Sequence, residues 1–211
     1  MYQNQKWMST FELIFQWVTR MAYINFFCGS FFLVLGLVFL GVFPSTIATL
    51  SIVRKWLNGQ DDFSIWKSFK AVYKQNFVKG NLVGWLFITV GSILYLNYEV
   101  LKAMEESIFV FSLFAFILLV FFYFALFIWI FPLMIHYESH LLQHLKNAFI
   151  IGVGNIHKST YILLWMFVIG YLSLEFPSMI LFFSISLFIL GWGWITLNVL
   201  KKIDTNVGKG L

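Results

Sequence analysis

The chain has 211 residues, of which 61% are hydrophobic and only 11% are charged, and its mean hydropathy is +0.85. A soluble domain carries about 25% charged residues, so this much apolar surface does not fit a single water-soluble core. The formal charge of +5 does not indicate nucleic acid, because the basic residues lie at the edges of apolar runs, where anionic lipid headgroups are their expected partners. The composition predicts an all-α integral membrane protein with one polytopic domain over residues 1–211.

The first twenty residues do not have the pattern of a signal peptide, because the apolar run that follows is too long and no A-x-A site closes it. Ser9 and Glu12 match a capping box, and apolar residues then recur at helical spacing. We expect an amphipathic helix at the membrane interface that runs into the first span, with a helix for a soluble partner as the alternative. The single cysteine, Cys28, excludes an internal disulfide.

Five apolar runs predict five transmembrane helices, because a span needs about 20 residues. Their approximate bounds are residues 21–43, 81–101, 107–135, 150–174 and 177–200. The fourth run is continuously apolar only over Thr160–Leu174 and reaches the length of a span only if it begins near Ala148, so sequence alone leaves open whether it fully spans. If all five cross the bilayer, only Lys6, Arg20 and Lys102 lie on one side, and the remaining Lys and Arg residues lie on the other. The positive-inside rule then predicts a multi-pass protein of the plasma membrane with its N-terminus outside and its C-terminus cytoplasmic.

The densest charge falls in the predicted cytoplasmic elbow, residues 44–80. Pro44 is expected to end the first helix, and Pro132 and Pro177 are expected to form similar helix-turn elbows. Apolar residues from Ile47 to Trp56 suggest a short helix along the membrane, which Asn58-Gly59 ends. A second amphipathic helix is expected from Asp62, with either lipid contact or a solvated edge for its lysines. The basic residues that we expect to contact lipid or a partner are Arg54, Lys55, Lys67, Lys70, Lys74 and Lys79.

A weak repeat suggests a degenerate parallel duplication. Phe43-Pro44 and Phe131-Pro132 are each followed by an isoleucine three residues past the proline (Ile47, Ile135) and a serine seven residues past it (Ser51, Ser139). Each unit would then consist of a span, a Phe-Pro elbow, cytoplasmic amphipathic helices and a second span. The amphipathic helices would thus follow the first and third spans of the protein. The matches are few, so coincidence is an equal alternative.

The strongest candidate for chemistry is a histidine series, His136, His140 and His144, whose spacing places the three rings on one face of a helix. No carboxylate lies at a suitable angle, so polar residues on an interfacial helix are the preferred interpretation and no metal or cofactor is expected. Gly80-x-x-x-Gly84 permits close helix approach, although such pairs are common. The apolar runs hold no charged residue near their middles, which argues against a self-sufficient secondary transporter.

Several segments resemble the YesL-type family of bacterial multi-pass membrane proteins, a domain of unknown function. The likeness is clearest in Leu40-Gly-Val-Phe-Pro44, in Val53-Arg-Lys-Trp-Leu-Asn-Gly59 with Asp61-Asp62, and from Phe69 to Asn81. It continues more weakly through Phe131-Pro132, Tyr137-Glu138 and Leu145-Lys-Asn-Ala-Phe149. The resemblance implies a protein found beside sugar-uptake systems, without assigned catalytic residues.

We therefore expect a non-enzymatic accessory or regulatory component of carbohydrate uptake, whose partners are the lipid bilayer and a sugar-transporter subunit rather than nucleic acid. A channel or transporter for a neutral solute such as a sugar is the alternative. A membrane-embedded enzyme is a lesser alternative.

Overall fold

The computed structural model describes residues 12–25, 38–60, 62–103, 106–176, 179 and 183–207, and every element in these ranges is helical. The helices of the core are α2 (Val38–Leu57), α3 (Ile65–Gln75), α4 (Phe77–Lys102), α5 (Glu106–His136), α6 (Leu141–Gly154), α7 (Ile156–Glu175) and α9 (Ile185–Val207). A further helix covers residues 12–25. The predicted all-α class is confirmed.

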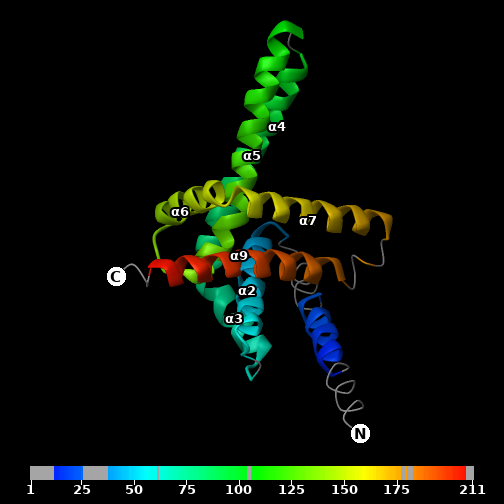
Figure 1. Ribbon diagram of the computed structural model, residues 1–211, viewed down its shortest axis with the longest axis vertical. Helices are drawn as coiled ribbons and strands as arrows, with labels where there is room; N and C mark the ends of the chain where they lie inside the picture. The colour runs from blue at the N-terminus through cyan, green and yellow to red at the C-terminus, as the bar shows by residue number, and fades with distance from the viewer. Residues whose placement is uncertain are drawn as a thin grey trace.

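Helices α4 and α5 form a long antiparallel hairpin that projects beyond the rest of the protein (Figure 1). Both are long and apolar enough to cross a membrane, over Phe77–Lys102 and Phe109–His136. These spans agree with the second and third apolar runs of the sequence. We call the other described helices the body.

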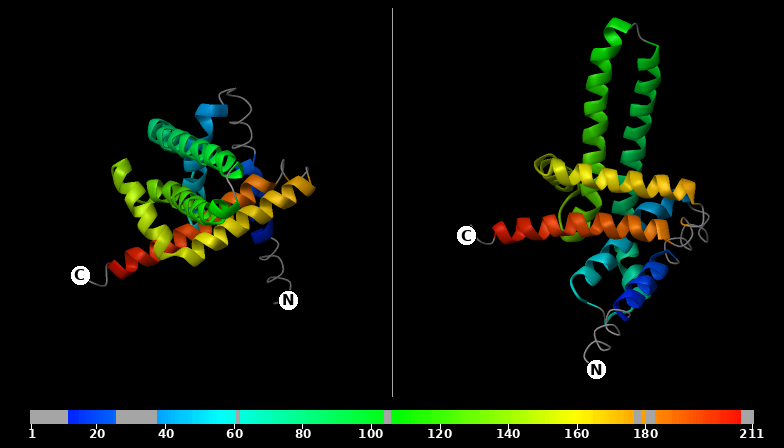
Figure 2. Two further views of the ribbon diagram at one scale, coloured as in Figure 1. Left: turned by 90° about the horizontal axis from the view of Figure 1, so that it is seen from above. Right: turned by 45° about the vertical axis from the view of Figure 1, so that its right-hand side comes forward.

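The body helices α7 and α9 run across the hairpin rather than alongside it, as two views from different sides show (Figures 1 and 2). They pack against each other where Gly191 of α9 faces the Trp165 ring of α7, and the Trp165 indole also donates to the Leu187 carbonyl at 3.2 Å. Among the described residues only the two hairpin helices meet the length and hydropathy of a membrane span, so the five-span topology is not confirmed. Most of the first run and the start of the fifth lie outside the described residues.

The core of the body forms around α2, and this differs from the prediction of a helix lying along the membrane. Ile47, Leu50, Val53 and Trp56 are almost completely buried among the other helices. The helix ends at Leu57, and Gly59 takes a φ of +73°, as the Asn58-Gly59 turn predicts. Apolar residues on α2 therefore indicate a helix that is surrounded on all sides.

The predicted elbows at Pro44 and Pro132 are wrong, because both prolines lie inside helices. Proline removes one backbone donor, yet a helix continues where other groups satisfy the freed carbonyl. The Trp192 indole takes that role for Pro132 by donating to the Ile128 carbonyl. Pro177 lies outside the described residues, as does Ser9 of the capping box.

The two Phe-Pro motifs meet in the core. The rings of Phe43 and Phe131 stack with their centroids 6.2 Å apart and their planes within 2°. Gly80 and Gly84 of α4 face Pro44 and Phe43, so the small-residue pair permits the close helix approach that its spacing predicts.

The order of helices agrees with a duplication, since α2–α3–α4 and α5–α6–α7 each consist of a Phe-Pro helix, a shorter helix and a longer one. Asn76 and Asn155 separate the second and third helices, and each side chain donates to the carbonyl four residues earlier, at 3.1 Å. The third helices differ in placement, because α4 lies alongside α5 whereas α7 runs across it (Figure 2). The duplication therefore stays a prediction.

Candidate functional site: a polar cavity between the helical units

A polar cavity of about 350 Å³ lies where α2, α3 and the start of α4 meet the segment that joins α5 to α6. Apolar side chains contribute only part of its wall. The lining residues are Ser51, Val72, Gln75, Asn76, Lys79, Met134, Ile135, Tyr137, Glu138, Ser139 and His144. The two serines are those that the sequence repeat pairs, so the cavity lies at the junction between the two units.

His144 is the most deeply buried ionisable group of this cavity, with an exposed fraction of 3%. Its Nδ1 atom has no hydrogen-bond partner among the described residues. Burial, reinforced by the positive charge of Lys79, lowers the pKa of His144 below its ordinary value. The imidazole is therefore neutral at neutral pH.

Lys79 brings a positive charge to the cavity from the first turn of α4. It forms no ion pair in the part of the chain that the structure describes. Asn76 breaks the helical path just before α4, which sets the direction of the turn that carries Lys79. The one carboxylate in the lining belongs to Glu138, which is exposed.

A hydrogen-bonded cluster of His136, Tyr137 and Asp204 supports the outer wall of the cavity. The Tyr137 hydroxyl donates to Asp204 Oδ1 at 2.6 Å, and His136 Nε2 lies 2.6 Å from Asp204 Oδ2. The hydrogen bond from Tyr137 lowers the pKa of Asp204, and His136 adds to this effect. Burial, together with the same carboxylate, raises the pKa of Tyr137 to about 12. Asp204 therefore ties the end of α9 to the end of α5 as an ionised group.

Arg54 stabilises the same end of α5 from the side of α2. Its guanidinium donates to the Ile135 carbonyl, one of the last carbonyls of α5, which lack helical partners. A positive charge at a helix C-terminus also interacts favourably with the helix dipole. Arg54 is thus a structural contact between the two units.

The histidine series does not occupy one helix face, so that prediction is wrong. Helix α5 ends at His136, His140 is the N-cap of α6, and His144 follows within α6. Residues 137–140 between them are not helical, which removes the regular spacing. Across the described residues, no group of three His, Cys, Asp or Glu side chains could hold a metal ion.

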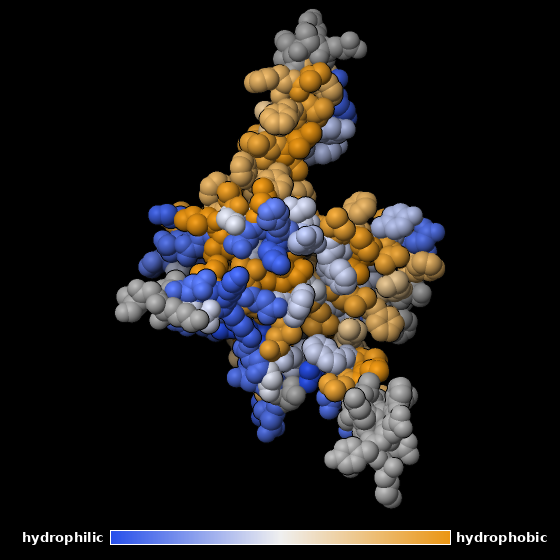
Figure 3. Space-filling view, viewed as in Figure 1, coloured by the Kyte–Doolittle hydropathy of each residue, from blue (hydrophilic) through white to orange (hydrophobic). Residues whose placement is uncertain are grey.

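The six basic residues that sequence reasoning singled out divide into two groups. Arg54 and Lys55 make contacts within the body, and Lys55 donates to the Ser68 hydroxyl at 2.9 Å and lies over the Phe63 ring. The remaining four, Lys67, Lys70, Lys74 and Lys79, are exposed. The surface around the C-terminal end of α9 and the outer end of α6 is also hydrophilic (Figure 3).

Sequence reasoning did not find the cavity, although two signals pointed to it. One was the serine pair of the repeat, and the other was the Tyr137-Glu138 segment within the family resemblance. Gln75, Asn76 and His144 come from different helices, and only the packing of those helices brings them together.

Comparison with known proteins agrees with the family resemblance. Residues 8–98 match a family model described as "Protein of unknown function, DUF624". The Bacillus subtilis (strain 168) proteins YteU and YesL are 28% and 26% identical to the chain, over 194 and 190 residues. The predicted resemblance to the YesL-type family is confirmed.

These similarities extend over nearly the whole chain. The match to YteU covers 92% of this chain and 86% of YteU, and the match to YesL covers 89% and 88%. A third protein of the same organism, YesV, is 29% identical over 187 residues and is covered to 89% on both sides. All three relatives are named as uncharacterized proteins, and no solved structure matches the chain.

Proposed function

We propose that this protein is an integral protein of the bacterial plasma membrane, that the α4–α5 hairpin crosses the bilayer, and that the body lies on the cytoplasmic side. The supporting observation is the exposure of the hairpin. No side chain from Ile88 to Val100 or from Phe109 to Phe124 is buried, although most are apolar. Exposed apolar surface on this scale requires a partner, and lipid can surround the hairpin, whose visible face is largely hydrophobic (Figure 3).

The polar groups of the hairpin also fit a lipid environment. Thr89, Ser92 and Asn97 each donate to the backbone carbonyl four residues earlier in their own helix, at 2.9 Å. The two hydroxyl donors and one of the two Asn97 amide hydrogens therefore need no water, which suits a polar side chain inside a bilayer. At the tip of the hairpin, the described residues Lys102 and Glu99 form a salt bridge. This charged end would lie in water beyond the bilayer.

The orientation rests on charge. Of the Lys and Arg residues that follow the first apolar run, only Lys102 lies at the tip; Lys79 lies at the opposite end of the hairpin, and the others belong to segments outside it. The positive-inside rule then favours a cytoplasmic body and an external tip. This agrees with the predicted cytoplasmic location of residues 44–80 and of the C-terminus.

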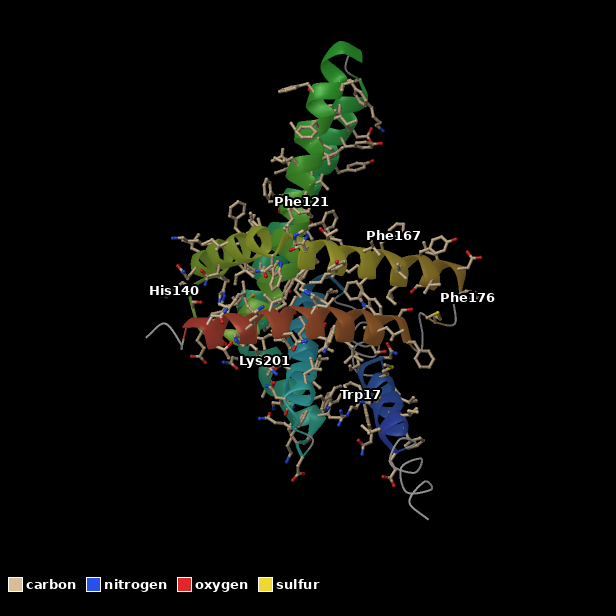
Figure 4. All side chains as sticks on the ribbon, viewed as in Figure 1. Trp17, Phe121, His140, Phe167, Phe176 and Lys201 are labelled. Carbon is tan, nitrogen blue, oxygen red and sulfur yellow. The ribbon has the colours of Figure 1, made fainter. Side chains whose placement is uncertain are left out.

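Helix α7 is better described as a helix in the plane of the membrane than as a fourth span. Leu164, Phe167, Tyr171 and Leu174 are exposed along one side of α7, away from the face that packs on α9. Figure 4 shows Phe167 on the same side of the body as the hairpin. This apolar side and the hairpin form one hydrophobic surface.

Lengths support this arrangement. From Ile88 to Lys102, α4 extends about 22 Å at 1.5 Å per residue, whereas the hydrocarbon core is about 30 Å thick. An interfacial helix sinks about 5–10 Å into the boundary of the acyl chains, so the α7 side in the inner leaflet makes up the difference. The predicted five-span arrangement instead requires α7 and α9 to turn until they lie along the hairpin.

Single-cysteine labelling distinguishes the two arrangements. In a Cys28→Ala background, a membrane-impermeant maleimide added to intact cells is expected to label Glu99→Cys at the tip but not Lys70→Cys in α3. Phe176→Cys at the end of α7 is labelled from outside if five helices span, and is not labelled from outside if α7 lies in the inner leaflet. Labelling of Lys70→Cys in intact cells would contradict a cytoplasmic body in both arrangements.

For the cellular role, we propose a non-enzymatic accessory or regulatory component of carbohydrate uptake. The family resemblance supports this role, and the exposed lysines of α3 offer the body a docking surface for a sugar-transporter subunit. Purification from mild detergent is expected to recover such a subunit, with less recovered for the Lys67→Glu/Lys70→Glu/Lys74→Glu variant. Unchanged growth of a deletion strain on every sugar tested would contradict the carbohydrate role.

A channel or transporter for a neutral solute is the alternative, because neutral polar residues lie in several apolar helices. Two pairs of them bond between helices: Asn25 with Ser186, and Ser173 with Ser184. These bonds favour helix association over a solute path. Solute flux into liposomes that contain this protein alone would support the alternative.

A further inference from the structure

We propose that the polar cavity binds the oxyanion group, a phosphate or a carboxylate, of a small soluble molecule, with Lys79 as its positive partner and His144 as a buried hydrogen-bonding partner. The proposal uses the orientation of the proposed function to place the cavity in the cytoplasm. The binding chemistry itself follows from the lining residues.

The charge in the cavity favours an anion. Lys79 lines the wall and has no acidic partner in the described chain, and α3, which forms one wall, holds Lys67, Lys70 and Lys74 and no acidic residue. Glu138 opposes this charge from an exposed position. A negatively charged group beside Lys79 would gain a charge-assisted hydrogen bond that the free protein lacks.

His144 supplies the second interaction. A buried polar atom without a partner is costly, so native structures nearly always satisfy it. Nδ1 of His144 is such an atom, and the residue lines the cavity from α6, whereas Lys79 lines it from α4. A neutral imidazole can donate a hydrogen bond to an oxyanion from this nitrogen when the proton resides there.

The hydroxyls of Ser51 and Ser139 complete the set. Both line the cavity. Hydroxyl donors beside a lysine and a histidine suit the several lone pairs of a phosphate or carboxylate group better than they suit an apolar ligand. The volume of about 350 Å³ accommodates a small molecule larger than the anionic group itself.

The position of the cavity favours a soluble ligand over a lipid headgroup. Lys79 precedes Ile88, where the stretch of α4 without buried side chains begins, by about 13 Å along α4 at 1.5 Å per residue. The α6–α7 layer lies between, because Gly152 of α6 packs on Trp129 and the Trp129 indole donates to Ser159 of α7. A headgroup would have to pass this layer to reach His144.

The test uses the full chain in nanodiscs of phosphatidylcholine and follows the imidazole NMR signal of His144, assigned with a His144→Asn variant. Inorganic phosphate and acetate serve as probes. We expect a saturable shift of this signal with at least one of them. Lys79→Gln should weaken the affinity about tenfold or more, the loss of one charge-assisted hydrogen bond. Glu138→Gln should strengthen it, because the opposing carboxylate is gone.

Lys70→Gln is the matched control, because Lys70 is exposed on α3 and does not line the cavity. The Lys70→Gln variant should bind the phosphate or acetate probe with the same affinity as the natural chain. Equal weakening in Lys70→Gln and Lys79→Gln, or no shift of the His144 signal with either probe, would overturn the proposal. So would a shift caused by phosphatidylglycerol without added phosphate, because it would show a lipid headgroup in the cavity.

The NMR result and the labelling result can fail separately. A His144 response with labelling of Lys70→Cys from outside would keep the anion site and refute the cytoplasmic body. The reverse combination would keep the membrane arrangement and refute the site.

Discussion

The indole N–H of Trp192 donates a 2.9 Å hydrogen bond to the backbone carbonyl of Ile128. This carbonyl is the one that residue 132 would bind in a regular helix, and Pro132 has no N–H to offer. The bond allows α5 to continue to His136. Trp192 and Ile128 are both almost completely buried, so water cannot replace the missing donor.

We expect Trp192→Phe to lower the free energy of unfolding by about 1–3 kcal/mol, because it leaves a buried carbonyl without a donor. Thermal unfolding in detergent measures the change. Pro132→Ala supplies the control, since alanine restores the backbone N–H that binds Ile128. In that background Trp192→Phe should cost less, and an equal cost in both backgrounds would show that packing of the ring, not the hydrogen bond, matters.

Gly84 is the second position with a sharp prediction. A Cβ added there would overlap the Phe43 ring, which is itself stacked on Phe131. Gly84→Ala should destabilise the protein by about 1–3 kcal/mol, because the ring must leave its stacked position or α4 must move away from α2. Unfolding in detergent reports this loss.

Gly170→Ala is the matched control for Gly84, because a Cβ at Gly170 of α7 meets no other atom within 4 Å. That variant should be neutral, or more stable by up to about 1 kcal/mol, since alanine favours a helix. Phe43→Ala should reduce the cost of Gly84→Ala. If the two glycine variants behave alike, the close approach of α4 and α2 is refuted.

The sequence predicts the hairpin well and the body poorly, and the reason is physical. The apolar runs around Ile88 and Phe114 are exposed on most sides in the structure, so length and hydropathy alone describe them. Pro44 and Pro132 are read locally as helix ends, yet both lie inside helices, and at Pro132 a donor from a distant helix satisfies the freed carbonyl. Trp192 lies sixty residues after Pro132 and offers no local signal of this role.

The cavity shows the same limit. The repeat pairs Ser51 with Ser139, but no sequence pattern links Asn76 or His144 to either serine. The histidine spacing was misleading because the non-helical residues 137–140 interrupt the helix between His136 and His144. Local periodicity cannot reveal where a helix stops when tertiary contacts such as that of Arg54 with Ile135 fix the end.

His144 predicts a pH dependence of stability near neutrality. Burial, followed by the charge of Lys79, lowers its pKa in the folded state, so the unfolded chain binds more protons as the pH falls below about 6.5. Stability should therefore decrease as the pH falls from the unfolded pKa toward the lower folded one. A hydrogen bond with the Ser139 backbone opposes this lowering of the His144 pKa only in part. His144→Asn should flatten this decrease in thermal unfolding between pH 7.5 and 5.5, whereas His157→Asn, at an exposed position, should retain it.

Asp204 gives the opposite case of an acid with a lowered pKa. Its hydrogen bond from Tyr137, followed by the interaction with His136, stabilises the carboxylate in the folded state. This contribution is present above the unfolded pKa of about 3.9 and is lost as the pH falls through the lower folded pKa. At neutral pH, Asp204→Asn should cost about 1 kcal/mol, a value reduced by the 46% exposure of the side chain.

Asp62→Asn is the control for Asp204, because Asp62 is an exposed residue in the turn before α3. Thermal unfolding from pH 7 to pH 3 should show a shallower acid decline for Asp204→Asn and an unchanged one for Asp62→Asn. The two curves of Asp204→Asn and the natural chain should converge in acid, where both lack the carboxylate. Parallel curves across the whole range would mean that the carboxylate contributes through packing, and that the bridge from α9 to α5 does not depend on its charge.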